Sequence, residues 1–341
     1  MTHPPDKDPG SALSGVLDSE AEPSVAGLIL NYNGRDVTLL TLESMVRVDY
    51  RRFDPVVIDN GSTDDSFDVI RKRYPQIRQL RVRENHGISW GLNHGIQWAL
   101  EKGYDYLLLM NNDIEVAPDM VTEMVKLAES NQHIGCVAPK SYYYGDRERL
   151  WSTGGQIHFR HSITDERGDG ELDRGQYERD EEVPYVNGCA MLVRAEAARA
   201  AGFWDPNYYL GLEDTDYCVR VKQQGYSCWY AHRAKLWHMI SASIGVYKPT
   251  RTFHTGRSGA VFLRRHATTL QKLQSLLWFA GAMPFAFLRE LPKRNARAVV
   301  QKVRGFWAGW RCPLEPIPTD YRDLLPGHEP GSAESTPTHP G

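Results

Sequence analysis

The stretch that decides the fold is residues 107–113, Leu-Leu-Leu-Met-Asn-Asn-Asp, where an unbroken apolar run ends abruptly in amide and carboxylate side chains. Such a run, without polar alternation, is typical of a strand buried on both faces of a sheet. Two earlier runs have the same form: residues 25–30 end at Asn31, and residues 55–58 end at Asp59. Because these strands alternate with helical patterns, we expect an α/β fold with a mostly parallel, Rossmann-like sheet.

Helices are expected on both faces of this sheet. Residues 37–46 and 66–73 have helical patterns, and a third helix starts at Ile88 with apolar residues at helical spacing. A fourth strand is expected over residues 79–83. Further elements are expected over residues 185–193 (a strand), 195–201 and 211–224 (helices), and 234–237 (a strand that precedes His238).

The composition of the 341 residues narrows the class of protein. Hydrophobic residues make up 41% and charged residues 24%, so a folded core is expected. The net charge of −3 argues against a nucleic-acid partner. The chain has 5 cysteines with no C-x-x-C pair, which indicates reduced thiols in a cytoplasmic enzyme and neither a disulfide framework nor a zinc site. No signal peptide is recognisable at the N-terminus.

Composition also divides the chain into segments. Residues 165–182 hold 9 acids and 3 arginines, and we interpret them as a solvated excursion. The expected segments are a disordered tail (1–23), a catalytic domain (24–250), a C-terminal helical extension (251–315) and a second disordered tail (316–341). Within the catalytic domain, we expect a nucleotide-binding half over about 24–115 and an acceptor half over about 116–250.

The C-terminal extension differs from the rest in charge. Residues 251–311 carry 12 Lys+Arg and one acid, Glu290, a net charge of +11 that leaves −14 for the remainder. Residues 276–288 are uncharged, but a transmembrane helix needs about 20 apolar residues. Apolar and aromatic residues flanked by arginines suit an element that lies on an anionic membrane surface, which places the protein peripherally on the inner face of the cell membrane. The alternative is an ordinary pair of buried helices.

The polar residues at the strand ends are candidate ligands. Open α/β sheets bind ligands outside the carboxyl ends of their strands. Asp59 is placed to accept a hydrogen bond from a pyrimidine N–H or a ribose hydroxyl. Asn85 and Gly87 precede a helix whose free N–H groups suit a diphosphate. Asp113 suits a hard divalent cation, since Mg²⁺ often takes one or two carboxylates plus substrate phosphates.

Asp214 is the candidate general base. On a helix it shares a face with Tyr217 and Cys218, and burial there raises a carboxyl pKa towards neutrality. The alternative is that Asp214 and Glu213 only favour the first turn of a helix through its dipole. His238 ends an apolar run, and a lone histidine of this kind is more often a core residue than a ligand.

Several ordered blocks together resemble one family. They are VAGLILNYNG (25–34), VVIDNGSTDDS (56–66), LLLMNNDIEV (107–116), VNGCAMLVRAEAARAAGFWD (186–205), YLGLEDTDYCVRVKQQGY (209–226) and His238. In this order they resemble the inverting GT-A glycosyltransferases of family 2, above all the bacterial rhamnosyltransferase and galactofuranosyltransferase branch. The resemblance extends over residues 25–265.

The resemblance implies a reaction. It implies a nucleotide-diphosphate sugar donor, dTDP- or UDP-linked, together with Mg²⁺ or Mn²⁺. The sugar, rhamnose or a related hexose, would pass with inversion to a hydroxyl of a saccharide or a lipid-linked saccharide during synthesis of cell-surface polysaccharide.

The resemblance also implies roles for single residues. Asn31 and Asp59 would hold the nucleotide base, and Asn112 would lie beside the donor. Asn111 and Asp113 would occupy the metal-binding Asp-x-Asp positions, with His238 as a further metal ligand. Asp214 would be the catalytic general base, and Gly188, Trp204 and Glu213 would lie at the sugar and acceptor end. One departure is Asn111, where the family has an acid, so Asp113 and His238 must carry more of the metal binding.

Two other functions stay open on the sequence alone. A sugar-nucleotide nucleotidyltransferase would have a Gly-rich loop with Arg or Lys after the first strand, and residues 31–35 match that poorly. A non-catalytic carbohydrate-binding subunit would tolerate the loss of Asp113 or Asp214, and both are present.

Overall fold

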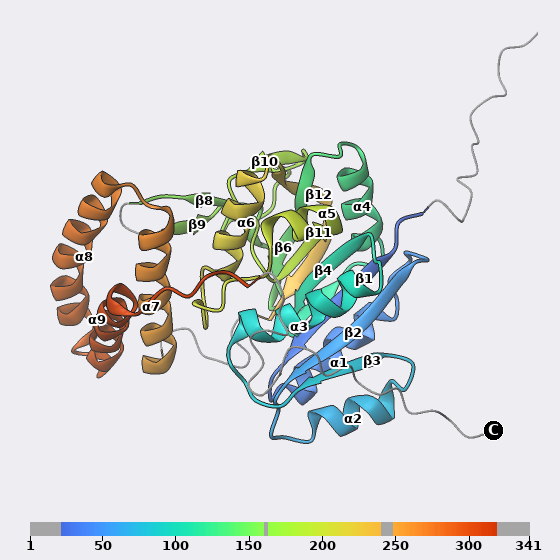
Figure 1. Ribbon diagram of the computed structural model, residues 1–341, viewed down its shortest axis with the longest axis horizontal. Coiled ribbons are helices and arrows are strands. Elements are labelled where there is room, and N and C mark those ends of the chain that lie inside the picture. Colours follow the sequence, from blue (N-terminus) through green and yellow to red (C-terminus); the bar gives the residue numbers. More distant parts are fainter. Residues whose placement is uncertain (1–21, 160–162, 240–247, 319–341) are drawn as a thin grey trace, which may run out of the picture.

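The computed structural model describes residues 22–159, 163–239 and 248–318. Most of the two expected tails, 1–23 and 316–341, lies outside the described residues, as do residues 240–247 of the expected acceptor half. Figure 1 shows a mixed α/β body built around one large twisted sheet, with a separate group of helices at one end.

The large sheet has the strand order β10-β12-β6-β11-β4-β1-β2-β3. Its first half is parallel, since β1 pairs in parallel with both β2 and β4, and β2 pairs in parallel with β3. The strands of this half are β1 (Val25–Asn31), β2 (Phe53–Asn60), β3 (Arg78–Val82) and β4 (Tyr106–Asn111). The expected parallel arrangement of this half of the sheet is therefore confirmed.

The second half of the sheet is mixed. β11 runs antiparallel between β4 and β6, whereas β12 runs parallel to β6 and also pairs with the short strand β5. The bounds are β5 (Ile114–Val116), β6 (Ile134–Tyr143), β7 (Asp146–Ser152), β10 (Glu181–Val183), β11 (Ala190–Arg194) and β12 (Ser227–His238). A separate hairpin is formed by β8 (Gly155–Ile157) and β9 (Thr164–Glu166).

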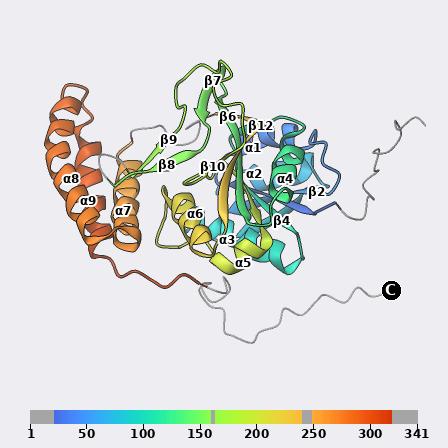
Figure 2. The ribbon, with the colours of Figure 1, turned by 90° about the horizontal axis from the view of Figure 1, so that it is seen from above.

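Two hydrophobic cores cover the two faces of the sheet, and each contains the apolar sides of different helices. One core contains residues of α1 (Arg35–Met45), α2 (Ser66–Arg73) and α4 (Met120–Glu129). The other contains residues of α3 (Ile88–Glu101), α5 (Ala195–Ala201) and α6 (Glu213–Gln223). The expected three-layer arrangement, with helices on both faces, is thus confirmed (Figures 1 and 2).

Strand register brings the polar strand ends to one edge. Asn31 lies opposite Asp59 in the β1–β2 pair, and Leu30 lies opposite Asn111 in the β1–β4 pair. The side chains that end β1, β2 and β4 therefore share the carboxyl edge of the parallel half.

The strand expected over residues 185–193 is shorter than predicted. β11 begins only at Ala190, because the preceding backbone N–H groups bond to side chains and not to a neighbouring strand. Gly188 donates to the Asp214 carboxylate, and Cys189 donates to the side-chain oxygen of Asn187.

The C-terminal helices form a compact group beyond the end of the sheet (Figures 1 and 2). They are α7 (Pro249–His266), α8 (Thr269–Glu290) and α9 (Ala296–Arg311), and the uncharged residues 276–288 lie within α8. Helices α7 and α9 pack closely because Gly256, Gly305 and Gly309 leave no room for a Cβ between the backbones. Among the described residues, no helix has both the length and the hydrophobicity needed to cross a bilayer.

Candidate active site

Asp113 and His238 are brought into direct contact at the carboxyl end of β4. Asp113 follows β4, and His238 is the last residue of β12, 125 positions later. Their Oδ1 and Nε2 atoms lie 3.1 Å apart, and both side chains are buried. The pairing arises because β12 extends along β5, where His238 lies opposite Ile114. The ring edge of Trp151 packs against the imidazole, with the centroids 4.4 Å apart.

This pair fits a divalent cation. Two atoms that bind one cation at about 2.1 Å and at right angles to each other lie about 3.0 Å apart, close to the observed separation. Carboxylate oxygen and imidazole nitrogen are both ordinary ligands of Mn²⁺, and carboxylate oxygen is preferred by Mg²⁺. Asn111, the residue in the first Asp-x-Asp position, is half-buried, and its backbone N–H donates to the carbonyl of Cys189.

Asp214 is held at the start of α6 by backbone donors. The N–H of Gly188 donates to its Oδ2 at 2.7 Å, and the N–H of Thr215 donates to its Oδ1 at 2.6 Å. Leu212, immediately before the helix, has a left-handed backbone with φ of 67°, which is strained for a leucine. A non-glycine side chain at position 188 would press against both Asp214 and the ring of Trp204. Gly188, Trp204 and Asp214 are therefore neighbours, as expected.

Burial raises the pKa of several carboxyl groups around Asp214. Burial raises the pKa of Asp214 itself, although the N–H groups of Gly188 and Thr215 oppose this by stabilising the carboxylate. Burial and the charge of Asp214 raise the pKa of Glu213 to about 8. Burial, with a further contribution from Asp214, raises the pKa of Glu166 to about 7. The site thus gathers acids whose ionisation is mutually coupled.

Glu166 is a site residue that the sequence did not reveal. It ends β9, and its carboxylate accepts from Ser152, from the Tyr185 hydroxyl at 2.8 Å and from the Asn187 amide at 3.3 Å. It belongs to the acid-rich run 165–182, which is largely exposed as expected. Nothing in that run distinguishes one partly buried glutamate from its solvated neighbours.

Asn31 is the centre of a buried hydrogen-bond network and has no bonding capacity left for a ligand. Its amide nitrogen donates to Asp59, and also to the hydroxyls of Ser62 and Ser66. Its oxygen accepts from Thr38 and from the amide of Asn112. Asn31 and Asn112 therefore join the ends of β1, β2 and β4, and Asn31 holds Asp59 in place.

Asp59 is fully buried at the end of β2. Its Oδ1 accepts from the backbone N–H of Ser62 at 3.1 Å, and Arg81 lies 3.7 Å away on the neighbouring strand β3. Arg81 is half exposed and also lies over the ring of Phe67. Arg81 is thus a second residue at this end of the sheet that the sequence did not single out.

Two backbone N–H groups at the start of α3 are bonded within the protein. Asn85 does bind the Gly87 N–H, at 2.8 Å, but the next N–H, of Ile88, donates to the carbonyl of Tyr209. The backbone of Tyr209 lies so close that a Cβ on Gly87 would touch it. The N–H groups of Gly87 and Ile88 are thus bonded within the protein, and a role of Asn85 and Gly87 in binding a diphosphate stays a prediction.

Residues 187–189 lie between the Asp214 carboxylate and the Asp113–His238 pair. Gly188 binds Asp214, and the next residue, Cys189, accepts from the N–H of Asn111 at the end of β4. Burial above all raises the pKa of the Cys189 thiol, and the negative charges of Glu166 and Asp113 add to this effect. Asp214 and Glu166 line a pocket of about 510 Å³, whereas Asp113 and His238 lie outside its lining. The geometry thus places Asp214 and the Asp113–His238 pair on either side of residues 187–189.

Comparison with known proteins places this geometry in a family. The profile of Glycosyl transferase family 2 matches residues 28–202. The "Uncharacterized protein y4gI" of Sinorhizobium fredii is 28% identical over 234 residues, which are 66% of this chain and only 25% of that relative. The N-acetylglucosaminyl-diphospho-decaprenol L-rhamnosyltransferase of Mycobacterium tuberculosis is 24% identical over 211 residues, 56% of this chain and 67% of that protein.

Solved structures agree on the fold. GalNAc-T7, crystallised with UDP, GalNAc and Mn²⁺, superposes with a TM-score of 0.58 at 16% identity, over 72% of this chain and 49% of that one. The mannosyltransferase PcManGT of Pyrobaculum calidifontis, in complex with GDP-Man and Mn²⁺, gives 0.51 at 14% identity, over 84% and 87%. The expected GT-A type of fold is thereby confirmed. Since the family profile matches half of the sequence, the chain belongs to glycosyl transferase family 2.

Proposed function

We propose that this protein transfers a sugar, with inversion, from a nucleotide-diphosphate donor to a hydroxyl of a saccharide or lipid-linked saccharide. The observation that carries the proposal is the position of Asp214, fixed by the Gly188 N–H at the side of a pocket. Through residues 187–189 this carboxylate is connected to the end of β4, where Asp113 and His238 form a cation-binding pair. The family match and the Mn²⁺ complexes of the structural neighbours support the same chemistry.

Asp214 acts as the general base in this proposal. Its raised pKa makes it a stronger base than an exposed aspartate, and the two backbone N–H groups keep its oxygens in place. It takes the proton of the acceptor hydroxyl, whose oxygen attacks the anomeric carbon opposite the leaving nucleotide diphosphate. Asp113 and His238 would hold a divalent cation that neutralises this leaving group, so no second carboxylic acid is needed.

The nucleotide is proposed to bind at the carboxyl ends of β1 and β2. Asp59 is the hydrogen-bond acceptor there, and Asn31 positions it. Arg81, half exposed and 3.7 Å from Asp59, supplies a positive charge at this end. Trp204 and Glu213 are proposed to shape the sugar and acceptor end, since both border Asp214.

Rhamnose from a dTDP-linked donor is our first choice of sugar, and a UDP-linked hexose is the second. The 24% identical relative is named a rhamnosyltransferase with a lipid-diphosphate acceptor, and this supports synthesis of cell-surface polysaccharide as the process. A site on the inner face of the cell membrane follows from such an acceptor.

A product assay tests the function. The protein is incubated with Mn²⁺ and each of a panel of nucleotide sugars, with and without saccharide acceptors, and the products are separated by mass. The proposal predicts a nucleoside diphosphate and a glycosylated acceptor. Pyrophosphate formed from a sugar phosphate and a nucleoside triphosphate would instead show a nucleotidyltransferase, and donor binding without any turnover would show a binding subunit.

A further inference from the structure

The pocket beside Asp214 is bordered by the C-terminal helices. It has a volume of about 510 Å³ and is lined on one side by β9 and the first turn of α6. On its other side it is lined by residues of α7, α8 and α9, among them Trp278 and Phe279. The proposed catalytic base and the C-terminal extension therefore share one cavity.

The chemical character of the lining changes across this cavity. Asp214 and Glu166 supply carboxylates, Arg251 and Lys302 supply positive charge, and α8 supplies an apolar wall. Arg251 lies near the acids, because its charge lowers the pKa of Glu213 against the effect of burial. A ligand that fits all three zones has a sugar hydroxyl, an anionic group and an apolar chain, in that order.

Lys302 is the clearest sign of an anionic ligand. Burial lowers its pKa, and within the described part of the chain its ammonium group has no hydrogen-bond or ion-pair partner. Taking an ammonium group out of water costs free energy that a paired anion would offset. A phosphate oxygen would satisfy this group with a charge-assisted hydrogen bond.

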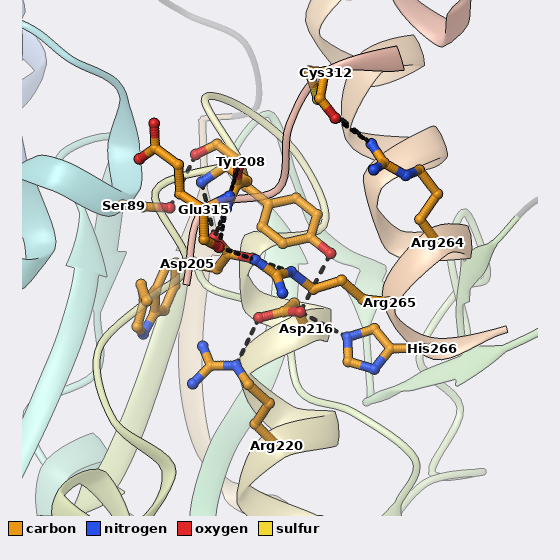
Figure 3. A network of polar contacts seen from close by, with 12 residues as sticks. Ser89, Asp205, Tyr208, Asp216, Arg220, Arg264, Arg265, His266, Cys312 and Glu315 are labelled. Atoms are coloured by element: carbon orange, nitrogen blue, oxygen red, sulfur yellow. Dashed lines mark hydrogen bonds and ion pairs between the residues drawn. The ribbon is translucent and has the colours of Figure 1, made fainter. Parts of the chain in front are cut away.

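The walls of the pocket are fixed without a ligand. Figure 3 shows Asp216 of α6 between Tyr208, Arg220 and His266, the last of which ends α7. The His266 Nε2 lies 2.7 Å from Asp216 Oδ1, and Arg220 donates to Oδ2 at 2.8 Å. Although burial raises it, the His266 hydrogen bond and the Arg220 charge hold the pKa of Asp216 below its usual range. This buried network joins α7 to the helix that carries Asp214.

The pocket is long on its α7 side. Arg251 and Leu263 both line it from α7, and 12 residues of helix span about 18 Å. Outside the pocket, α8 exposes a continuous stripe of large apolar side chains. These are Leu270 (74% exposed), Leu273 (54%), Leu277 (67%), Phe285 (73%), Leu288 (65%) and Leu291 (53%).

We propose that this pocket binds the lipid diphosphate of the acceptor. The inference rests on the proposed function and assigns its acceptor subsite. The acceptor hydroxyl lies at Asp214, Arg251 and Lys302 bind the diphosphate, and the first part of the lipid chain packs against Trp278 and Phe279.

Binding of farnesyl diphosphate to the full-length protein, measured by isothermal titration calorimetry, tests the assignment. We expect Lys302→Gln to weaken binding about tenfold or more, and Trp278→Ala to weaken it severalfold. Trp278 is half exposed, so its replacement leaves folding intact. Matched controls are Arg304→Gln and Trp307→Ala, which change exposed residues of α9 outside the pocket lining and should bind as the wild type does.

Three further ligands identify which part of the probe is recognised. Inorganic pyrophosphate and farnesol should each bind much more weakly than farnesyl diphosphate, because each fills only one zone. Equal binding of pyrophosphate, or a Lys302→Gln variant that binds normally, would overturn the proposal. So would phosphatidylglycerol vesicles that abolish the difference between Lys302→Gln and the wild type, since adsorption to a membrane surface would then explain the affinity.

The same experiment separates this inference from the proposed function. Transfer to a water-soluble saccharide without any binding of farnesyl diphosphate would remove the pocket assignment and leave the transferase intact. Specific binding without sugar transfer in any assay would support the pocket and remove the transferase.

Discussion

Asp113 and His238 form the part of the site that is best defined at the level of single atoms. The carboxylate oxygen of Asp113 and the imidazole nitrogen of His238 meet at the end of β4, 3.1 Å apart. A cation placed between them would complete the coordination with donor phosphates.

The first prediction concerns these two residues. His238→Ala should weaken Mn²⁺ binding by more than about tenfold in the presence of a nucleoside diphosphate, as measured from the electron paramagnetic resonance signal of free Mn²⁺. His232→Ala is the matched control, because His232 lies 2.7 Å from Asp180 in a histidine–aspartate pair elsewhere on β12. Equal loss in both variants would show that Asp113 and His238 are not the ligands.

The second prediction follows from Glu213. Burial, assisted by the charge of Asp214, raises the pKa of this group from the ordinary value of 4.5 to about 8. The folded state therefore binds the Glu213 proton more tightly than the unfolded state does. This tighter binding stabilises the fold at low pH, and the stabilisation is lost as pH rises between these two pKa values. Glutamine has no proton to lose in this range. The melting temperature of Glu213→Gln should therefore fall less than that of the wild type between about pH 5 and about pH 8.

The control for this pH experiment is Glu196→Gln on α5, since Glu196 is exposed. Its melting curve should follow that of the wild type across the same pH range. A Glu213→Gln variant with an unchanged pH dependence would show that the glutamate is not buried as a neutral acid.

For single residues, the sequence predicts which polar side chains meet better than it predicts which of them become buried. Asp113 and His238 meet as expected, and Asp214 lies beside Gly188 and Trp204 as expected. Glu166 was not predicted, because its burial depends on Tyr185 and Asn187, which approach it from a distant part of the chain.

Among the elements, α7 and α9 determine how the C-terminal extension is held together. Three glycines allow their backbones to touch, and Thr252 of α7 donates to the carbonyl of Ala298 at 2.8 Å. Helix α8 packs on this pair mainly through Phe279, whose ring stacks on Phe306 with the centroids 4.2 Å apart. Close backbone contact therefore holds α7 against α9.

The third prediction tests this close contact. A Cβ at position 305 would collide with the carbonyl oxygen of Phe253, so Gly305→Ala should lower the free energy of unfolding by about 1–3 kcal/mol. Gly281→Ala, in the exposed middle of α8, meets no atom within 4 Å and should raise it by about 0.5–1 kcal/mol. Urea unfolding measures both, and a tolerated alanine at position 305 would contradict the packing described here.

The helices of both halves were predicted closely, whereas the short strands of the acceptor half were not. Residues 66–73 and 195–201 form helices with the expected bounds, because apolar spacing and flanking breakers mark them clearly. The short strands β8, β9 and β10 have no such pattern: β8 and β9 pair with each other in a hairpin, and β10 pairs with the distant strand β12. The strand at residues 185–193 is shortened by side-chain bonds to its backbone that periodicity does not record.

In the whole molecule, the charge is divided unevenly. Residues 251–311 carry a net charge of +11, and they form the group of helices at one end of the structure (Figure 2). The apolar stripe of α8 lies in this same group. An anionic bilayer would attract the charge and accept the stripe, as the sequence predicted for this segment.

The fourth prediction concerns this surface. The protein should sediment with phosphatidylglycerol vesicles more than with phosphatidylcholine vesicles, and high salt should reduce the bound fraction. Leu277→Asp, at a residue that is 67% exposed on α8, should reduce binding severalfold. Leu40→Asp, at an exposed leucine on α1, is the control and should bind normally. Equal loss in both variants would argue against α8 as the contact surface.

In the proposed reaction, Asp214 removes the proton from the acceptor hydroxyl. The most direct measurement is the turnover number of Asp214→Asn, together with its donor affinity, compared with Asp119→Asn at an exposed site. We predict that Asp214→Asn lowers turnover about 10²–10⁴-fold while donor affinity stays unchanged, and that Asp119→Asn behaves as the wild type does. Near-normal turnover of Asp214→Asn would contradict the account.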